Sequence, residues 1–238
     1  MSVQAENIST DFNEANKLYE QGKYSEAAAR YETILQAGSV SAPVYFNLGN
    51  AFLKSGRVGR AIAAYRNAEK LSPRDPDVRT NLQFAREQAG GGATVPTLRW
   101  SSWIGRLTLN EWTILTMIVV SVLFLLLAIR QWRFNLKISL RGFLMLIGIL
   151  GAFLLVCLAT AIHQEFFVRS AVVIVPEAVV RPGPFDESPG AFTLRDGAEV
   201  TVLDQKENWL QIADATQRTG WLPEKNVMSI GRLRQSKK

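Results

Sequence analysis

Two long apolar runs, 112–129 and 142–162, dominate the hydropathy pattern of this 238-residue chain. Spanning the hydrocarbon core of a bilayer takes ~20 apolar residues, and both runs have that length. Neither contains a charged residue or a histidine, as expected where each charge costs a few kcal/mol. A pair of buried helices in a soluble enzyme is the alternative. The tandem arrangement favours two transmembrane helices, and so do the flanking tryptophans Trp100, Trp103, Trp112 and Trp132.

The loop between the runs, residues 130–141, predicts the topology. It carries four positive charges and no negative one: Arg130, Arg133, Lys137 and Arg141. Short basic loops stay in the cytoplasm. Because two spans return the chain to the side on which it started, we expect the regions before and after them to be extracytoplasmic.

The first ten residues bear on this topology, because an exported N-terminal domain needs a signal sequence. Val3-Gln4-Ala5 places small residues at the two positions that a signal peptidase reads, and Glu6 would then begin the mature chain. We therefore interpret residues 1–10 as the remnant of a signal peptide. The alternative is a cytoplasmic start, with both soluble domains in the cytoplasm.

The N-terminal region, residues 11–89, repeats with a period of 34 residues. Six residues of the first copy recur in the second: Asn13, Asn16, Gly22, Ala27, Ala29 and Tyr31 return as Asn47, Asn50, Gly56, Ala61, Ala63 and Tyr65. Part of the pattern returns once more, as Asn81, Leu82, Ala85 and Gly90. The spacing within each copy predicts helices, with Gly49 and Ala61 letting paired helices approach while Phe52 and Tyr65 fill the space between them.

This period resembles that of the tetratricopeptide repeat, an all-α solenoid of paired helices. The second copy matches best, through Tyr45, Leu48, Gly49, Phe52, Ala61, Tyr65 and Pro73. Asp75 followed by Pro76 predicts the start of one further helix, which would cap the array before Gly90-Gly91-Gly92. We expect two repeats and a capping helix, and then a linker and interfacial segment at 90–111.

The asparagines of the repeats are the candidate partner-binding residues. Asn13, Asn47 and Asn81 are expected in register on the first helices, which line the concave surface of such arrays, and an amide suits a peptide backbone. The alternative is that asparagine is an ordinary filler of this position. Asn16 and Asn50 complete the set. Repeats that clamp a C-terminal carboxylate use a pair like Asn16 and Asn47. The basic residues of such clamps are replaced here by Phe12, Asp77 and Asn81.

The region 170–231 changes to the pattern of short β-strands separated by turn residues. Strands are predicted at 171–175, 178–181, 199–204, 209–213 and 220–222. Five such strands favour a small all-β barrel, and the run from Val180 to Pro184 together with Gly220-Trp221-Leu222 resembles the bacterial SH3-like family. Eukaryotic relatives bind proline-rich segments through an aromatic groove. Trp209 is the candidate surface platform for a ligand, with a place in the small core as the alternative, and we expect Trp221 as a core residue.

Composition and charge exclude several functional classes. The net charge of +6 is scattered and concentrates in the loop and in the basic tail 232–238, so it does not indicate nucleic-acid binding. The single cysteine, Cys157, lies inside the second apolar run, and the single histidine, His163, directly follows that run. No catalytic triad, metal site or phosphate-binding loop can be assembled from the sequence, so we expect no enzyme activity, no cofactor and no bound metal.

The order of the modules is more informative than any one of them. Tetratricopeptide repeats, a two-helix transmembrane hairpin and an SH3-like barrel resemble the BatE-like proteins of the bacterial aerotolerance (Bat) operon. The resemblance implies a non-enzymatic scaffold in the bacterial inner membrane, beside von Willebrand factor A domain membrane proteins and a MoxR-type AAA+ ATPase. The alternative is a cell-envelope adaptor whose barrel binds peptidoglycan or a peptide while its repeats recruit a cell-wall enzyme.

Overall fold

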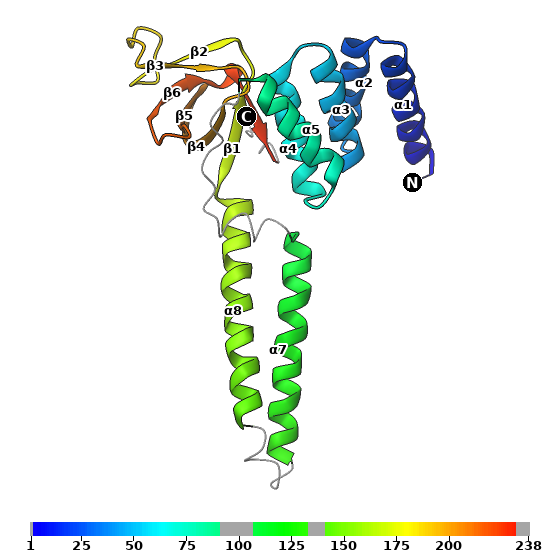
Figure 1. Cartoon of the computed structure of the whole chain (residues 1–238), viewed down its shortest axis with the longest axis vertical. Helices are drawn as coiled ribbons and strands as arrows, with labels where there is room; N and C mark the ends of the chain where they lie inside the picture. Colours follow the sequence, from blue (N-terminus) through cyan, green and yellow to red (C-terminus); the bar gives the residue numbers. More distant parts are fainter. Residues whose placement is uncertain (1, 91–106, 133–140, 232–238) are drawn as a thin grey trace. The chain divides into compact units, whose positions relative to one another are not determined.

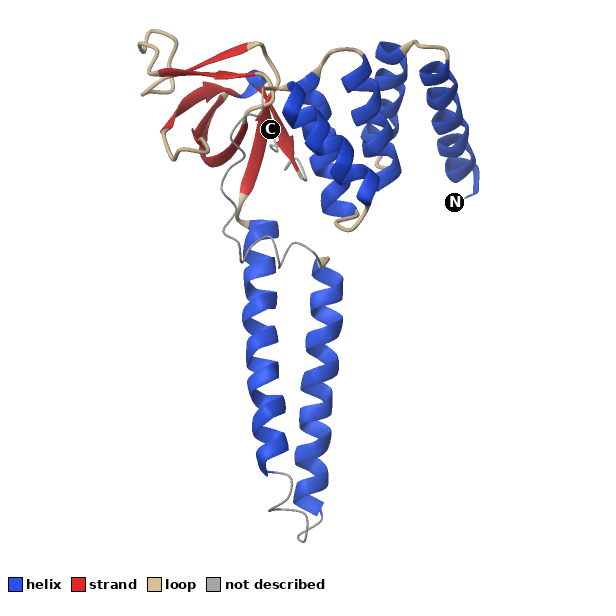
Figure 2. Cartoon of the chain, viewed as in Figure 1, coloured by secondary structure: helices blue, strands red, loops and turns tan. Residues whose placement is uncertain are grey.

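The computed structural model describes residues 2–90, 107–132 and 141–231. They fall into two compact units, one formed by the N-terminal helices with the C-terminal strands and the other by the two long apolar helices. Figure 1 labels the elements, and Figure 2 shows helices on both sides of the linker but strands only in the C-terminal part. The predicted residues Gly91, Gly92, Trp100, Trp103, Arg133, Lys137 and the tail 232–238 lie outside the described residues.

The N-terminal region forms five helices that pack in antiparallel pairs. They are α1 (Ser2–Glu20), α2 (Tyr24–Gln36), α3 (Ala42–Lys54), α4 (Val58–Leu71) and α5 (Pro76–Gln88). Tyr31, Phe52 and Tyr65 are fully buried between them. A Cβ atom added at Gly49 would lie 2.5 Å from the Tyr65 ring, which confirms that this glycine lets α3 and α4 approach.

The helix ends follow the repeat. Gly22, Gly56 and Gly90, each 34 residues apart, have φ angles of +76°, +77° and +89°. Only glycine adopts this conformation without strain, and it is the usual way to end a helix. At the start of α5 the carboxylate of Asp75 accepts hydrogen bonds from the N–H groups of Asp77 and Val78, at 2.9 and 3.3 Å. The predicted cap at Asp75 and Pro76 is therefore confirmed.

The C-terminal region forms a five-stranded antiparallel sheet in the order β6-β5-β4-β1-β7, with a hairpin of β2 and β3. The strands are β1 (Arg169–Val173), β2 (Glu177–Val180), β3 (Phe192–Arg195), β4 (Glu199–Lys206), β5 (Trp209–Ala213), β6 (Thr219–Pro223) and β7 (Val227–Ile230), with the 3-10 turn η2 (Glu224–Asn226) before β7. Val180, Ile212 and Leu222 are fully buried in its core. The sequence missed β3 and β7, which have four residues each.

The barrel and the repeats share a hydrophobic core, which the sequence did not predict. Val172 of β1 and Ile230 of β7 belong to the same buried cluster as the helical residues. Around them, the side-chain carboxamide oxygen of Asn67 on α4 accepts a hydrogen bond from the backbone N–H of Gly231 at 2.7 Å. The carboxylate of Asp196 accepts one from the backbone N–H of Gly59. The two modules therefore fold as one unit.

A buried carboxylate reinforces this interface. Glu199 at the start of β4 is almost fully buried, and one of its oxygens lies 2.6 Å from the Arg86 guanidinium of α5. The other oxygen lies 3.1 Å from Nε of Arg66 on α4. Because an unpaired buried charge is costly, this arrangement requires both helices to remain in place beside the barrel.

The second unit is an antiparallel pair of long helices, α7 (Leu109–Trp132) and α8 (Arg141–Phe166). Both are long and apolar enough to cross a membrane, and they extend beyond the apolar runs at both ends. Large apolar side chains such as Met145 and Ile149, each 70% exposed, cover their outer surface. A core helix of a soluble domain would bury such side chains.

The contact between α7 and α8 buries one of the flanking tryptophans. Trp112 packs against Cys157 and is nearly buried, and its position at a membrane interface stays a prediction. A Cβ atom added at Gly148 would meet nothing within 4 Å, whereas one added at Gly151 would lie 3.8 Å from Val119, an ordinary van der Waals distance. Gly151 therefore lies in the contact between α7 and α8.

Candidate partner-binding surface

A hydrogen-bonded set of one tyrosine and two asparagines recurs in the repeats. In the first set, the amide oxygen of Asn16 accepts bonds from the Tyr31 hydroxyl at 2.6 Å and from Nδ2 of Asn47 at 3.1 Å. The second set lies 34 residues later: the oxygen of Asn50 accepts from the Tyr65 hydroxyl at 2.7 Å and from Nδ2 of Asn81 at 2.9 Å. Each set ties a helix pair to the first helix of the next repeat.

The predicted asparagines therefore occupy different environments. Asn13 is exposed, whereas Asn16, Asn47, Asn50 and Asn81 are half-buried. Asn47 and Asn81 each donate a hydrogen bond within the array, so these amides have a structural role whatever else they bind. That Asn13, Asn16, Asn47, Asn50 and Asn81 hold a partner stays a prediction.

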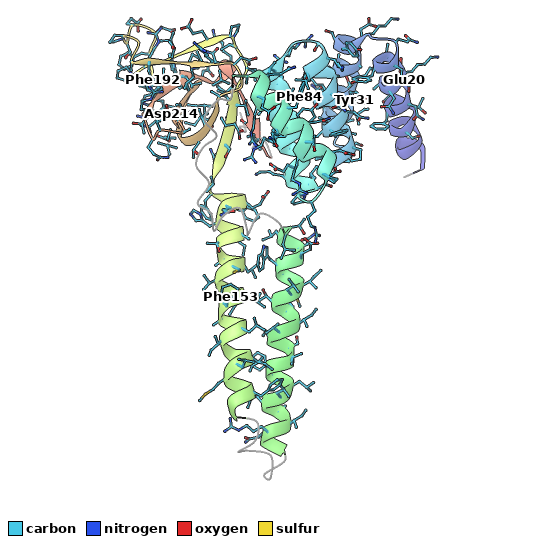
Figure 3. All side chains as sticks on the ribbon, in the orientation of Figure 1. Glu20, Tyr31, Phe84, Phe153, Phe192 and Asp214 are labelled. Atoms are coloured by element: carbon cyan, nitrogen blue, oxygen red, sulfur yellow. The ribbon has the colours of Figure 1, made fainter. Side chains whose placement is uncertain are left out.

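The structure brings three of these residues together around a hollow. Its volume is about 220 Å³, and it is lined by Asn16, Tyr19, Glu20, Tyr31, Asn47 and Asn50. Asn13 and Asn81 do not line it. Figure 3 labels Glu20 and Tyr31, from α1 and α2.

Three lining residues were not among the sequence candidates: Tyr31, which belongs to the repeat pattern, and Tyr19 and Glu20, which do not. Residues three and four apart share one face of a helix, so both follow Asn16 at the spacing that places them beside it. That spacing is the signal which could have identified them. The 34-residue pattern does not identify Tyr19 and Glu20, because these residues do not recur in the next copy, where the equivalent positions are Leu53 and Lys54.

The lining of the hollow is polar, with a single formal charge. Burial raises the pKa of Tyr31 to about 12, and the nearby amide of Asn47 lowers that pKa only in part. Burial also raises the pKa of Tyr19, which the nearby Tyr24 raises further. Both phenols are therefore neutral at physiological pH, and the carboxylate of Glu20 supplies the charge.

An apolar residue takes the place of asparagine in the last helix. Asn16, Asn50 and Phe84 are related by the 34-residue period, and Phe84 on α5 is 51% exposed. Figure 3 shows its position on this helix. The surface formed by the first helices of the repeats thus offers a polar hollow between α1 and α3 and an exposed aromatic ring on α5. We call it the repeat surface.

Trp209 belongs to the barrel and lies apart from the asparagines in the fold. It is half-buried at the start of β5, where it pairs with Lys206 of β4 and Pro223 of β6. Strand alternation places it on the face opposite Leu210 and Ile212, which fill the core. Its position is compatible with a surface platform, and its role in binding stays a prediction.

Trp221 is buried, at 7% exposed, but it alternates with the core residue Leu222 and so lies on the other face of β6. The ammonium of Lys206 lies 5.5 Å from its ring centroid. Its backbone N–H and C=O pair with Arg181 at 2.7 and 2.8 Å. The expected burial of Trp221 is therefore confirmed, on the face of β6 opposite the central cluster of the barrel core.

The turn between β5 and β6 is held by a buried carboxylate. Asp214 accepts hydrogen bonds from the backbone N–H groups of Thr216 and Arg218, at 2.8 and 2.9 Å, and pairs with the Arg218 guanidinium at 2.7 Å. Burial opposes ionisation, but these bonds outweigh it and hold the pKa of Asp214 below its usual range. Arg218 also lies 4.3 Å from the centroid of the Phe192 ring, and Figure 3 labels Phe192 and Asp214.

Comparison with known families identifies the two soluble modules. Residues 12–76 match the tetratricopeptide repeat, and residues 175–228 match the bacterial SH3 domain. A search of curated proteins found no match to the chain. The fold therefore combines two known module types with a pair of long apolar helices. Among the described residues, no group of three or more side chains is placed to hold a metal ion.

Proposed function

We propose that this protein is a non-enzymatic, membrane-anchored scaffold that recruits protein partners through its repeat surface. The hollow at Asn16, Asn47 and Asn50 carries the proposal, because the packing of the helices leaves it open and its lining is polar. Both module types are ones that mediate protein–protein interaction or peptidoglycan binding. The exposed ring of Phe84 adds an apolar contact of the kind found at interfaces.

The anchor is the pair of helices α7 and α8. Their length, their composition and their exposed apolar side chains support insertion in a bilayer. The basic loop supports an orientation in which the repeats and the barrel are extracytoplasmic. We place the protein in the inner membrane of a bacterium, with the soluble unit on the periplasmic side.

A finer proposal rests on the resemblance in module order alone. In a Bat-type complex for envelope stress or oxygen tolerance, the protein would act beside von Willebrand factor A domain membrane proteins and a MoxR-type AAA+ ATPase. Co-purification of those proteins with the full chain from native membranes would support this assignment. Their absence from every preparation that retains other partners would contradict it.

The test of the scaffold is partner recovery from native membranes with wild type and Phe84→Glu. Phe84 is exposed, so the variant should fold, while a charge in its place should disrupt an apolar contact. Gln83→Glu, on the neighbouring exposed position, is the matched control for the added charge. We expect Phe84→Glu alone to lose partners. Equal recovery with both variants would show that the repeat surface does not bind them.

A second candidate function follows from the match of residues 175–228 to the bacterial SH3 domain. We propose as the alternative that the barrel binds peptidoglycan or a peptide while the repeats recruit a cell-wall enzyme. The test is sedimentation of the full chain with purified peptidoglycan, comparing wild type with Trp209→Ala. The full chain is needed because Val172 and Ile230 of the barrel are buried against the helices. Sedimentation that depends on Trp209 would favour this function over the first.

A further inference from the structure

The hollow in the repeat surface has the chemistry of a cation site. The amide oxygens of Asn16 and Asn50 each accept two hydrogen bonds within the array. An amide oxygen has two lone pairs, so these two oxygens are satisfied before any ligand enters. Glu20 is then the strongest acceptor in the lining, and no hydrogen bond or ion pair engages it among the described residues.

The surroundings of Glu20 also favour a cation. The half-buried Tyr19 lines the hollow beside Glu20, and aromatic rings attract ammonium and guanidinium groups. The nearest basic residues along the chain, Lys17 and Lys23, are exposed and do not line the hollow. A C-terminal carboxylate in the hollow would be repelled by the carboxylate of Glu20, and no basic residue in the lining would compensate. The hollow therefore disfavours the C-terminal carboxylate that clamp-type repeats bind.

We propose that this hollow binds the cationic side chain of an arginine or lysine in the recruited protein. The ammonium or guanidinium group would pair with the carboxylate of Glu20 and contact Tyr19. This inference rests on the proposed function and specifies the partner's chemistry: an exposed segment that carries a basic residue at the contact.

The probe is N-acetyl-argininamide, added to the full chain in nanodiscs at constant ionic strength. N-acetyl-citrullinamide, which has nearly the same shape without the charge, is the control ligand. The chain has five tyrosines, so 3-fluorotyrosine gives a small set of ¹⁹F signals that single Tyr→Phe variants assign. We expect the arginine probe to shift the signals of Tyr19 and Tyr31 in a saturable manner, and the citrulline probe to leave them unchanged.

Glu20→Gln provides the decisive variant, and Glu26→Gln, an exposed glutamate on α2, is its matched control. Because Glu20 is exposed, we expect Glu20→Gln to weaken binding of the arginine probe about three- to fivefold. Equal shifts with both probes, equal affinity of Glu20→Gln and wild type, or no shift at all would overturn the inference. Partner recovery that depends on Phe84 would still support the scaffold in that case, so the two failures are distinguishable.

Discussion

The carboxylate of Asp196 accepts a hydrogen bond from the backbone N–H of Gly59, at 3.1 Å, across 137 positions of the sequence. Gly59 is the second residue of α4, where backbone N–H groups have no partner within the helix. Asp196 supplies that partner from the turn between β3 and β4. One acidic side chain of the barrel thus caps a helix of the repeats.

Gly59→Ala tests whether the two modules form one unit in solution. A Cβ atom at this position would overlap Asp196 and the carbonyl of Val173. We expect the variant to lose about 1–3 kcal/mol of unfolding free energy, as overpacked sites do, measured by chemical denaturation in detergent. If the barrel did not contact α4, alanine would instead stabilise the helix by up to about 1 kcal/mol.

The sign of this effect therefore decides between the two arrangements. Gly148→Ala is the matched control, because Gly148 is also helical and has open space around it. We expect no loss of stability in that variant. A stabilised Gly59→Ala protein would show that the contact between Asp196 and Gly59 does not form.

Asn50→Ala tests the structural role of the asparagine sets. It removes the partner of the fully buried Tyr65, whose hydroxyl donates to Asn50 at 2.7 Å. Leaving a buried hydroxyl unpaired costs about 1–3 kcal/mol, which thermal unfolding followed by circular dichroism should detect. Asn13→Ala, at an exposed position, should cost almost nothing.

The double variant Asn50→Ala/Tyr65→Phe should recover part of the loss, because the unpaired hydroxyl is then absent. Equal stability of the Asn50 and Asn13 variants would contradict the structural role. The same reasoning applies to the triple variant in which alanine replaces Asn13, Asn47 and Asn81. Alanine favours the helix, but this variant should lose stability, since Asn47 and Asn81 donate bonds between helices.

The sequence predicted the elements whose signals are local. Asp75 and Pro76 identify a helix start from adjacent residues, and the glycines at a 34-residue spacing identify the helix ends. The period also located the asparagines, but not their partners. Asn16 bonds to Asn47, 31 residues away, so the pairing depends on the rotational phase of neighbouring helices as well as on the repeat.

The long-range contacts could not be predicted in this way. Glu199 and Arg86 are separated by 113 positions, and each taken alone has the sequence context of an ordinary solvated charge. The shared core between Val172 and the helices follows from the packing of two modules, and neither module's pattern encodes it.

The pH dependence of stability should differ in sign between two aspartates. Burial raises the pKa of Asp196 above its ordinary value, and hydrogen bonds from the N–H groups of Gly59 and Gly197 only partly offset this. The folded protein thus binds this proton more tightly than the unfolded chain does. The contribution of Asp196 to the unfolding free energy is fully present below the ordinary pKa and is lost as the pH rises through the raised value.

Asp196→Asn should remove that slope, because an amide does not titrate, and its oxygen can still accept the hydrogen bond from Gly59. Asp214 gives the opposite sign: its lowered pKa means that stability present at neutral pH is lost as the pH falls through the lowered value. Both contributions can be measured from the unfolding free energies of wild type, Asp196→Asn and Asp214→Asn in a pH series. If the stability difference between wild type and variant changed with pH in the same direction for both aspartates, the assigned pKa shifts would be contradicted.

The orientation in the membrane can be tested with single cysteines. On a Cys157→Ser background, Ser139→Cys reports on the basic loop and a second site reports on the barrel. Ser188 is only 4% exposed, so its exposed neighbour Glu187 is the better position for that second cysteine. A membrane-impermeant maleimide applied to spheroplasts should label Glu187→Cys and leave Ser139→Cys unmodified. Both cysteines should react after the membrane is permeabilised.

The physical reason is the retention of Arg130, Arg133, Lys137 and Arg141 on the cytoplasmic side. Replacing Arg133 and Lys137 by glutamine weakens this bias, so labelling at Ser139→Cys should rise in that background if charge sets the orientation. The reverse pattern in the parent protein, with label at Ser139→Cys alone, would place the repeats and the barrel in the cytoplasm. The repeat surface would then meet cytoplasmic partners, and peptidoglycan would no longer be accessible to the barrel.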